Sequence, residues 1–200
     1  EKNSGWEGIY ENKNIIGLIA DNKSSISLEP GGQLELSGAP LKNLHMTCDE
    51  TGTHLKELRK ALQDLDLGMA GFGFHPISSR ENSNFMPKGR YEIMKKWMPK
   101  VGSMGLDMML RTCTIQVNLD YSNEIDMAKK FKTALTLQPI ITALFANSPF
   151  YEGKPSNFLS LRTEVWRNTD PSRCGVPACI FDNDFGYEMW VDYLLNVPMY

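Results

Sequence analysis

The chain has 200 residues, of which 42% are hydrophobic and 22% charged, the ordinary composition of a globular protein with a sizeable core. A formal net charge of -3, a pI of about 5.7 and scattered lysines and arginines give no basic stripe, so we expect no nucleic-acid partner. No apolar run approaches the roughly 18 residues that a membrane helix needs, so we expect no membrane partner either.

The four cysteines, Cys48, Cys113, Cys174 and Cys179, include no C-x-x-C pair and have no histidines at zinc-finger spacing. We therefore expect reduced thiols, with a Cys174–Cys179 disulfide as the alternative. The sequence does not begin with methionine, shows no targeting peptide and stops in mid-pattern. We expect residues 1–200 to form a single domain that is an incomplete part of a larger catalytic domain, lacking N-terminal and C-terminal portions.

The first predicted element is a hairpin. Side chains alternate in residues 25–29 and again in 33–37, and the Pro-Gly-Gly sequence between them supplies the turn. This hairpin would carry Glu29 and Glu35 near one end of a sheet. Two close carboxylates stay ionised together only when a cation lies between them or when both face water. Both alternatives, a metal-ligand pair and two solvated glutamates, stay open at this point.

Three elements are predicted next along the chain. Apolar residues at three- and four-residue steps predict an amphipathic helix over 41–65, with its apolar stripe facing the core. Small and aromatic residues alternate over 68–76, which predicts a strand packed closely against another backbone. A second helix is expected over 90–99.

The second half of the chain predicts a strand over about 110–120 and a long helix over about 123–146. Pro139 should kink this helix, because proline removes a backbone hydrogen bond and crowds the preceding turn. The polar residues 149–157 indicate a loop, and 185–195 a further helix or mixed segment.

Over residues 112–120 of the predicted strand, one face is entirely polar. The alternation separates this face from an apolar one that carries Cys113 and Ile115. Short hydroxyls and amides, rather than long charged side chains, suit a sheet face that lines a ligand, but a plain exposed face shows the same pattern. The polar residues are Thr112, Thr114, Gln116, Asn118 and Asp120.

Two arginines are candidate anion ligands. Arg90 stands at the entry of a predicted helix, where backbone amides and a guanidinium could hold an anion together. Arg162 interrupts an apolar context, so it needs a carboxylate or phosphate partner if it is buried. An internal salt bridge from Arg162 to Glu164 or Glu152 is the alternative.

Four segments carry a family resemblance. The chain from about residue 15 to 200 resembles the plant and proteobacterial type of glutamate-cysteine ligase. The segments are Ser27-Leu-Glu-Pro-Gly-Gly-Gln-Leu-Glu-Leu-Ser-Gly-Ala39, Met86-Pro-Lys-Gly-Arg-Tyr91, Gly105-Leu-Asp-Met-Met-Leu-Arg-Thr-Cys-Thr-Ile-Gln-Val-Asn118 and Ala143-Leu-Phe-Ala-Asn-Ser-Pro-Phe150 with Glu152-Gly-Lys-Pro155.

The resemblance implies an α+β fold of the glutamine-synthetase type, in which an antiparallel sheet forms a cradle flanked by helices. It also implies an activity, the first step of glutathione biosynthesis. ATP phosphorylates the side-chain carboxylate of glutamate, and the amine of cysteine then displaces phosphate to give γ-glutamylcysteine. The expected partners are the small molecules glutamate, cysteine and ATP, and a homodimer is an open alternative.

The resemblance also implies site residues. Glu29 and Glu35 match metal-binding carboxylates of the family, with Mg²⁺ as the expected cofactor. Arg90 and Arg162 match arginines that contact substrate and phosphate, and both are the expected catalytic residues. Further expected substrate-binding residues are Tyr200, in the cysteine pocket, and Gln116 and Asn118, near magnesium or nucleotide.

Other properties stay open. Cys48 matches a cysteine that takes part in a redox-sensitive disulfide in some relatives, but its partner would lie beyond residue 200. The alternatives to the ligase are another carboxylate-amine ligase with a different amine acceptor and a non-catalytic remnant that binds ATP or metal. The expected location is cytoplasmic if the protein is bacterial and the plastid if it comes from a plant.

Overall fold

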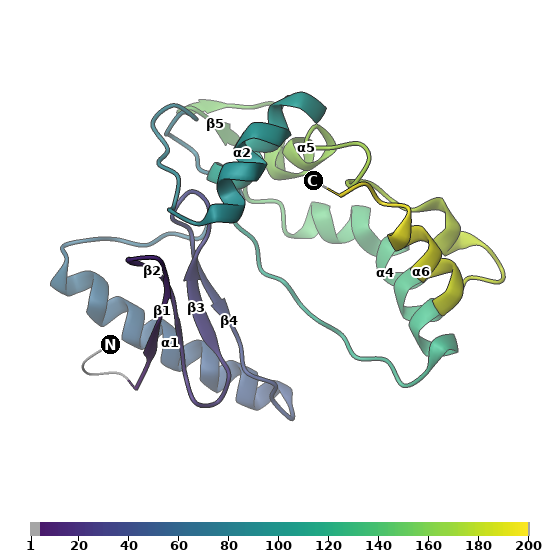
Figure 1. Ribbon diagram of the computed structural model, residues 1–200, viewed down its shortest axis with the longest axis horizontal. Coiled ribbons are helices and arrows are strands. Elements are labelled where there is room, and N and C mark those ends of the chain that lie inside the picture. Colours follow the sequence, from purple (N-terminus) through teal and green to yellow (C-terminus); the bar gives the residue numbers. More distant parts are fainter. Residues whose placement is uncertain (1–4, 200) are drawn as a thin grey trace. The chain divides into compact units, whose positions relative to one another are not determined.

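The computed structural model describes residues 5–199 and divides the chain into two compact units (Figure 1). Unit 1 comprises the residues up to Gly71 and Ser83–Glu92, and unit 2 comprises Phe72–Asn82 and the residues from Ile93 onward. Each unit is described by itself below. Helices and antiparallel sheets occur together in the chain, in agreement with the predicted α+β class.

Unit 1 is built on a four-stranded antiparallel sheet in the order β1-β2-β3-β4. The predicted hairpin is confirmed as β3 and β4, whereas the two strands that precede it were not predicted. The strands span Glu7–Glu11 (β1), Asn14–Ile19 (β2), Ser25–Leu28 (β3) and Leu34–Ser37 (β4).

The turn between β3 and β4 forms for the reason that the sequence indicates. Gly32 has a φ of 82°, which a side chain with a Cβ adopts only at a cost. The backbone N–H of Glu29 donates to the carbonyl of Gln33 at 2.8 Å and closes the turn. Because Ser27 pairs with Glu35 across the ladder, Ser27, Glu29 and Glu35 lie on the same face of the sheet.

Helix α1 (Leu44–Asp64) confirms the predicted helix over 41–65, and Asn43 caps it by accepting from the N–H of Met46. The prediction that its apolar stripe faces a core is wrong, because no residue of α1 is buried. Leu44 remains 80% exposed and Leu65 66% exposed. The periodic pattern predicted the helix correctly. Burial of its apolar stripe would require a partner surface, which the described residues do not supply.

The helices of unit 2 follow the predicted periodic segments, and α2 begins in unit 1. Three predictions are confirmed, as α2, α4 and α6, while α3, α5 and the short 3-10 helix η1 were not predicted. The ribbon of α4 changes direction part-way along its length, as expected from Pro139 (Figure 1). The bounds are Gly89–Val101 (α2), Gly105–Arg111 (α3), Glu124–Leu144 (α4), Leu161–Arg167 (α5), Ala178–Phe181 (η1) and Tyr187–Leu195 (α6).

Two predicted strands are not formed in the part of the chain that the structure describes. Residues 68–76 are irregular, apart from one antiparallel bridge between Phe74 and Thr112. Residues 110–111 close α3, and the chain then runs without a ladder to residue 120. Alternation alone cannot supply the neighbouring strand that a ladder needs. The predicted loop over 149–157 contains a minimal hairpin, β5 (Phe150–Tyr151) and β6 (Lys154–Pro155).

Unit 2 has two small hydrophobic cores. One consists of Phe74, Leu161 and Val165, with Met104, Met108 and Tyr151 packed against it. The other consists of Met127, Ile180 and Phe185, with Phe131 and Trp190 among the side chains packed against it. The first core holds α5 against α3, and therefore fixes the helix that carries Arg162.

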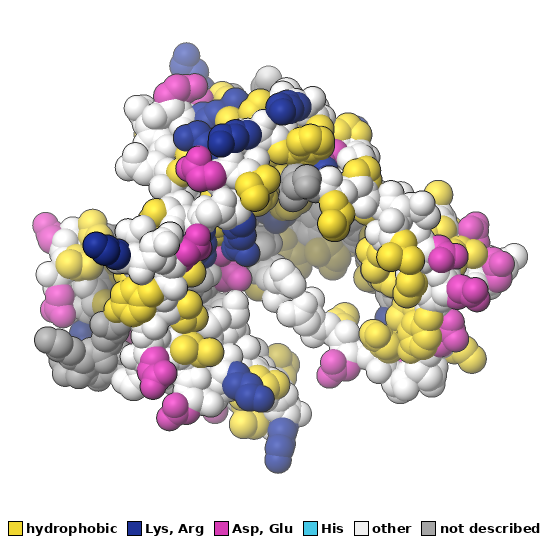
Figure 2. Space-filling view, viewed as in Figure 1, with side chains coloured by type: hydrophobic (Ala, Val, Ile, Leu, Met, Phe, Trp, Pro, Cys, Tyr) yellow, Lys and Arg dark blue, Asp and Glu magenta, His cyan; other side chains and the backbone are white. Residues whose placement is uncertain are grey.

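Many apolar side chains remain exposed. Figure 2 shows hydrophobic side chains on the surface over α4 and α6, where Leu144 is 71% and Leu195 79% exposed. Ile115 is 93% exposed on the segment that was predicted to be a strand, so both faces of that segment are open. Among residues 5–199, no helix has the length and apolar character needed to cross a membrane.

All four cysteines are free thiols, so the alternative of a Cys174–Cys179 disulfide is not formed. Cys48 is exposed on α1.

Candidate functional site

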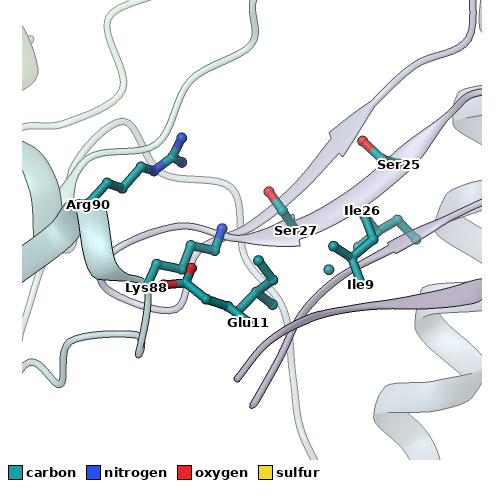
Figure 3. Close-up of a pocket in the computed structure, with 9 residues that line it drawn as sticks. Ile9, Glu11, Ser25, Ile26, Ser27, Lys88 and Arg90 are labelled. Atoms are coloured by element: carbon teal, nitrogen blue, oxygen red, sulfur yellow. The ribbon is translucent and has the colours of Figure 1, made fainter. Parts of the chain in front are cut away.

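Unit 1 contains a cavity of about 350 Å³ on one face of its sheet (Figure 3). Its polar lining comes from three places in the chain: Glu11 at the end of β1, Ser25 and Ser27 of β3, and Lys88 and Arg90, just before and within the first turn of α2. Ile9 and Ile26 add apolar lining. A pocket with an apolar wall and a few convergent polar groups is the usual form of a small-molecule site.

Glu29 is the carboxylate around which the basic residues of this site gather. Its Oε1 lies 3.9 Å from Nζ of Lys88, and its Oε2 lies 3.8 Å from Nη2 of Arg90. Both separations exceed a direct hydrogen bond. Oε1 accepts from the hydroxyl of Ser27 at 3.0 Å, and Oε2 accepts from the hydroxyl of Tyr91 at 3.2 Å. Glu29 is therefore the counter-ion of two cations and is held in place by two hydroxyls.

Arg90 is exposed over most of its side chain, yet its orientation is fixed by the buried Tyr91. Its Nη2 donates to the Tyr91 hydroxyl at 3.1 Å, and its guanidinium carbon lies 5.0 Å from the centre of the same ring. This hydrogen bond raises the pKa of Arg90, and the charge of Glu29 acts in the same direction. Burial raises the pKa of the Tyr91 hydroxyl, so it stays protonated and can donate to Glu29.

Glu29 and Glu35 supply the donor chemistry that magnesium prefers. They are oxygen ligands on one face of the sheet, and Mg²⁺ is commonly bound by one or two carboxylates together with substrate phosphates and water. Glu35 is exposed and accepts only a weak hydrogen bond, 3.3 Å from the hydroxyl of Ser37. Within residues 5–199, no group of three or more His, Cys, Asp or Glu side chains could hold a metal ion alone. Two carboxylates do not make a closed cage, so a magnesium ion at this pair would need further oxygen ligands such as phosphate or water.

Arg162, in unit 2, is the second candidate anion ligand. The predicted alternative of an internal salt bridge is wrong, because Glu152 pairs with Arg111 at 3.4 Å and Glu164 with Arg167 at 3.6 Å. The Nε of Arg162 is buried and has no hydrogen-bond acceptor in the described chain. Burial lowers the pKa of Arg162, and a nearby Cys113 charge would act against this shift. A bound anion would supply the missing partner.

The backbone around Arg162 is well fixed. The N–H of Arg162 donates to the hydroxyl of the buried Ser148 at 3.1 Å, and the N–H of Leu161 donates to the carbonyl of Ser148 at 3.0 Å. The guanidinium lies 5.7 Å from the centre of the Trp166 ring. The start of α5 is thus held by a residue that stands well before it in sequence.

The remaining predicted site residues are less informative. Gln116 and Asn118 are exposed on the extended segment after α3, and the side-chain amide of Gln116 donates to Oδ1 of Asn118 at 3.0 Å. Tyr200 lies outside the described residues. In unit 1 the structure brings Glu29 and Arg90 together; in unit 2 it joins Gln116 to Asn118 and leaves Arg162 on α5.

Sequence reasoning missed several residues of the site. Lys88 and Tyr91 stand in the same segment as Arg90, yet only the arginine was singled out. The signal that could have found Lys88 is its position two residues before Arg90, in a segment that leads into a helix. Its burial could not be inferred, because that depends on the sheet against which it packs.

The family to which this chain belongs follows from its similarity to known proteins. The family described as Glutamate-cysteine ligase family 2 (GCS2) matches residues 3–200. The chain belongs to this family. Within it, the chain is 58% identical over 195 residues to the glutamate-cysteine ligase, chloroplastic, of Brassica juncea. It is 57% identical to the protein of the same name from Arabidopsis thaliana and to glutamate-cysteine ligase B, chloroplastic, of Oryza sativa subsp. japonica.

These alignments cover 98% of this chain but only part of each relative. The chain spans 38% of the Brassica juncea protein, 37% of the Arabidopsis thaliana protein and 39% of the Oryza sativa protein. The four segments that carried the resemblance all lie within the matched range. The family assignment suggested by the sequence is therefore confirmed.

Proposed function

We propose that this chain provides part of the active site for ATP-dependent joining of the glutamate side-chain carboxylate to the amine of cysteine. The observation that carries the proposal is the similarity at 57–58% identity along 98% of the chain to proteins named glutamate-cysteine ligase. The geometry supports it, because Arg90, Lys88 and Arg162 are cations whose contacts with described carboxylates are long or lacking. Glutamate, ATP and acyl phosphates are all anionic.

The proposed reaction has two steps. The γ-phosphoryl group of ATP passes to an oxygen of the glutamate side-chain carboxylate, which gives ADP and γ-glutamyl phosphate. The cysteine amine then attacks the acyl carbon, the carbon–oxygen bond to phosphate breaks, and the amine loses a proton. The products are γ-glutamylcysteine and inorganic phosphate. No covalent intermediate with the protein is formed.

Phosphoryl transfer of this kind depends on positioning and on neutralisation of negative charge. In unit 1, Arg90 would hold an oxyanion with a guanidinium that Tyr91 orients. In unit 2, Arg162 would do the same with a guanidinium whose Nε is already desolvated. An arginine fork matches two oxygens of a carboxylate or phosphate at once.

Glu29 and Glu35 are the proposed carboxylate ligands of Mg²⁺, which when bound would neutralise phosphate charge. Glu35 is the less engaged of the two, whereas Glu29 also neutralises Lys88 and Arg90. Gln116, Asn118 and Tyr200 remain proposed substrate contacts on the basis of the resemblance.

We further propose the glutamine-synthetase-like cradle as the finer fold, with the four-stranded sheet of unit 1 as part of its wall. The chloroplastic relatives favour the plastid among the two expected locations. A homodimer remains a prediction.

The test is ADP release from Mg-ATP by the longest native reading frame that contains this chain, with glutamate present and cysteine added or withheld. We expect cysteine-dependent ADP release and γ-glutamylcysteine detected by mass spectrometry. Turnover only with another amine would indicate a sister carboxylate-amine ligase. Absence of turnover and of Mg-ATP binding would indicate a non-catalytic remnant.

A further inference from the structure

Lys88 is a nearly buried cation on the wall of the unit 1 cavity. The residue is only 7% exposed, and it is the most deeply buried lysine among the described residues. In Figure 3 its side chain extends from the start of α2 toward β3, where Ser27 projects on the same side of the sheet. The ammonium group therefore faces the cavity from a fixed, water-poor position.

The ammonium of Lys88 lacks the hydrogen bonds that a buried charge needs. Its nearest carboxylate oxygen is Oε1 of Glu29 at 3.9 Å, which is an ion pair without a hydrogen bond. That oxygen already accepts from the hydroxyl of Ser27. The ring centre of Tyr91 lies 5.4 Å from Nζ. An ammonium has three donors, so the described residues leave its hydrogen-bonding capacity unused.

Nearby carboxylates are committed elsewhere. Glu11 lines the same cavity, but its Oε1 accepts from the backbone N–H of Gly89 at 2.8 Å. Glu29 is shared with Arg90. Burial of an ion without compensating hydrogen bonds is costly, and folded proteins rarely leave such a group without a partner.

The charges around the cavity also favour a bound anion. Lys88 and Arg90 are two positive charges that share the single carboxylate of Glu29, at 3.9 Å and 3.8 Å. An anion bound between Lys88 and Arg90 would stabilise both charges. Lys88, immediately before α2, and Arg90, the second residue of α2, line the same cavity.

We propose that Lys88 and Arg90 together form an oxyanion-binding subsite in the cavity on the unit 1 sheet, with Lys88 as its buried, substrate-contacting cation. The ligand class is a phosphate or carboxylate group. The hydroxyls of Ser25 and Ser27, which line the cavity, can donate to the same oxyanion. The inference rests on the proposed function for the identity of the anion, which is either a phosphate of ATP or a carboxylate of glutamate.

The experiment measures binding directly and therefore does not depend on turnover. Mg-ATP, glutamate and inorganic phosphate are titrated separately into the longest native protein by calorimetry, for the unmodified protein and for Lys88→Met. The Met side chain keeps most of the length of lysine and removes its charge. Lys96→Met, at an exposed lysine of α2, is the matched control.

We expect Lys88→Met to weaken the affinity for one of the ligands at least tenfold, while Lys96→Met changes none by more than about twofold. Loss of affinity for Mg-ATP and phosphate would assign the subsite to phosphate. Loss for glutamate alone would assign it to a carboxylate. Either result would stand even if no γ-glutamylcysteine were formed, which separates this proposal from the proposed reaction.

Unchanged affinity for all three ligands would overturn the proposal and make Lys88 a counter-ion of Glu29. If Lys88→Met does not fold, Lys88→Gln is the second variant, because its amide keeps a polar donor at this position while the charge is lost. Normal binding by a folded Lys88→Gln protein would overturn the proposal equally.

Discussion

Two buried basic residues in this chain have opposite surroundings. In unit 2, Arg111 is 1% exposed and meets Asp107 at 3.0 Å and Glu152 at 3.4 Å. Its guanidinium carbon lies 4.4 Å from the ring centre of Phe74 and 4.7 Å from that of Tyr151. In unit 1, Lys88 is almost as buried but has one carboxylate at 3.9 Å and a cavity beside it.

The two cations differ in their charged partners. Arg111 contacts two carboxylates through Nη1, although its buried Nε and Nη2 have no hydrogen-bond partner among the described residues, whereas Lys88 has one carboxylate beyond hydrogen-bond distance. Arg111 is surrounded by two carboxylates and two aromatic rings, and Asp107 also pairs with Arg80. All of these groups lie in unit 2, where they fix the residues next to the Phe74 core. Lys88 has no comparable set of partners. Burial of a charge therefore indicates function only when its partners are counted as well.

The largest expected effect is a loss of folding stability when a carboxylate partner of Arg111 is removed. Asp107→Ala removes the carboxylate that Arg111 and Arg80 share. We expect the free energy of unfolding to fall by about 3–5 kcal/mol. Chemical denaturation measures it. Lys130→Ala, which breaks an exposed ion pair with Asp126 on α4, is the control and should leave the transition unchanged. Equal stability of Asp107→Ala and the parent would refute the structural role.

Arg162→Ala tests another buried cation, one that has an unpartnered donor and no carboxylate among its described contacts. We expect ligation to fall about a hundredfold, the effect of losing one charge-stabilising donor, with little change in unfolding. Steady-state rates of γ-glutamylcysteine formation and a denaturation curve measure the two quantities. The control is Arg167→Ala on the same helix, where the arginine is 77% exposed. Near-normal rates of ligation in Arg162→Ala would show that Arg162 has a structural role and does not contact the substrate.

Asp170 provides a pH test of a second structural pair, since it is buried beside Arg173. Burial alone would raise the pKa of Asp170, but hydrogen bonds from Ser172 and Arg173 outweigh burial and lower it. A carboxylate with a lowered pKa adds stability above its ordinary pKa of about 3.9 and loses that contribution as pH falls through the folded-state value.

Asp170→Asn should therefore reduce stability at pH 7 and weaken the dependence of unfolding on acid below about pH 4. Thermal unfolding at a series of pH values measures both. If the variant and the parent protein lose stability in the same way as the pH falls, Asp170 does not contribute as described.

The smallest expected effect concerns the proposed metal ligands. Glu29→Gln removes a charged oxygen ligand, so we expect the Mg²⁺ concentration for half-maximal ligation to rise several-fold. Magnesium titration at fixed ATP measures it, with Glu7→Gln at an exposed position of β1 as the control. An unchanged magnesium requirement would mean that Glu29 acts only as the counter-ion of Lys88 and Arg90.

Much of the helical structure could be predicted from the sequence. The helices over 90–99 and 123–146 were predicted, and the structure shows that Asn123 caps the second by accepting from the N–H of Asp126. The β3–β4 hairpin was found because Pro30-Gly31-Gly32 specifies the turn. The strand over 110–120 was not formed, since a ladder depends on a neighbour that the pattern cannot reveal.

The site was only partly predicted, because some of its residues are brought together by contacts between segments that are distant in sequence. Motifs identified Arg90 and Glu29, and the structure brings them within 3.8 Å. The role of Lys88 could not be predicted, because its burial depends on the unit 1 sheet, whose strands are distant from it in sequence. The Arg111 network was missed because its members come from α3 and two distant loops.

The comparison is tested most directly by measuring unfolding and ligand binding side by side in Lys88→Met and Arg111→Met, each made in the longest native protein. We predict that Arg111→Met loses stability in chemical denaturation, whereas Lys88→Met unfolds like the parent and loses affinity for Mg-ATP or glutamate. The opposite pattern, with Lys88→Met unstable and Arg111→Met stable but defective in binding, would contradict the assignment of Lys88 to the ligand and Arg111 to the fold.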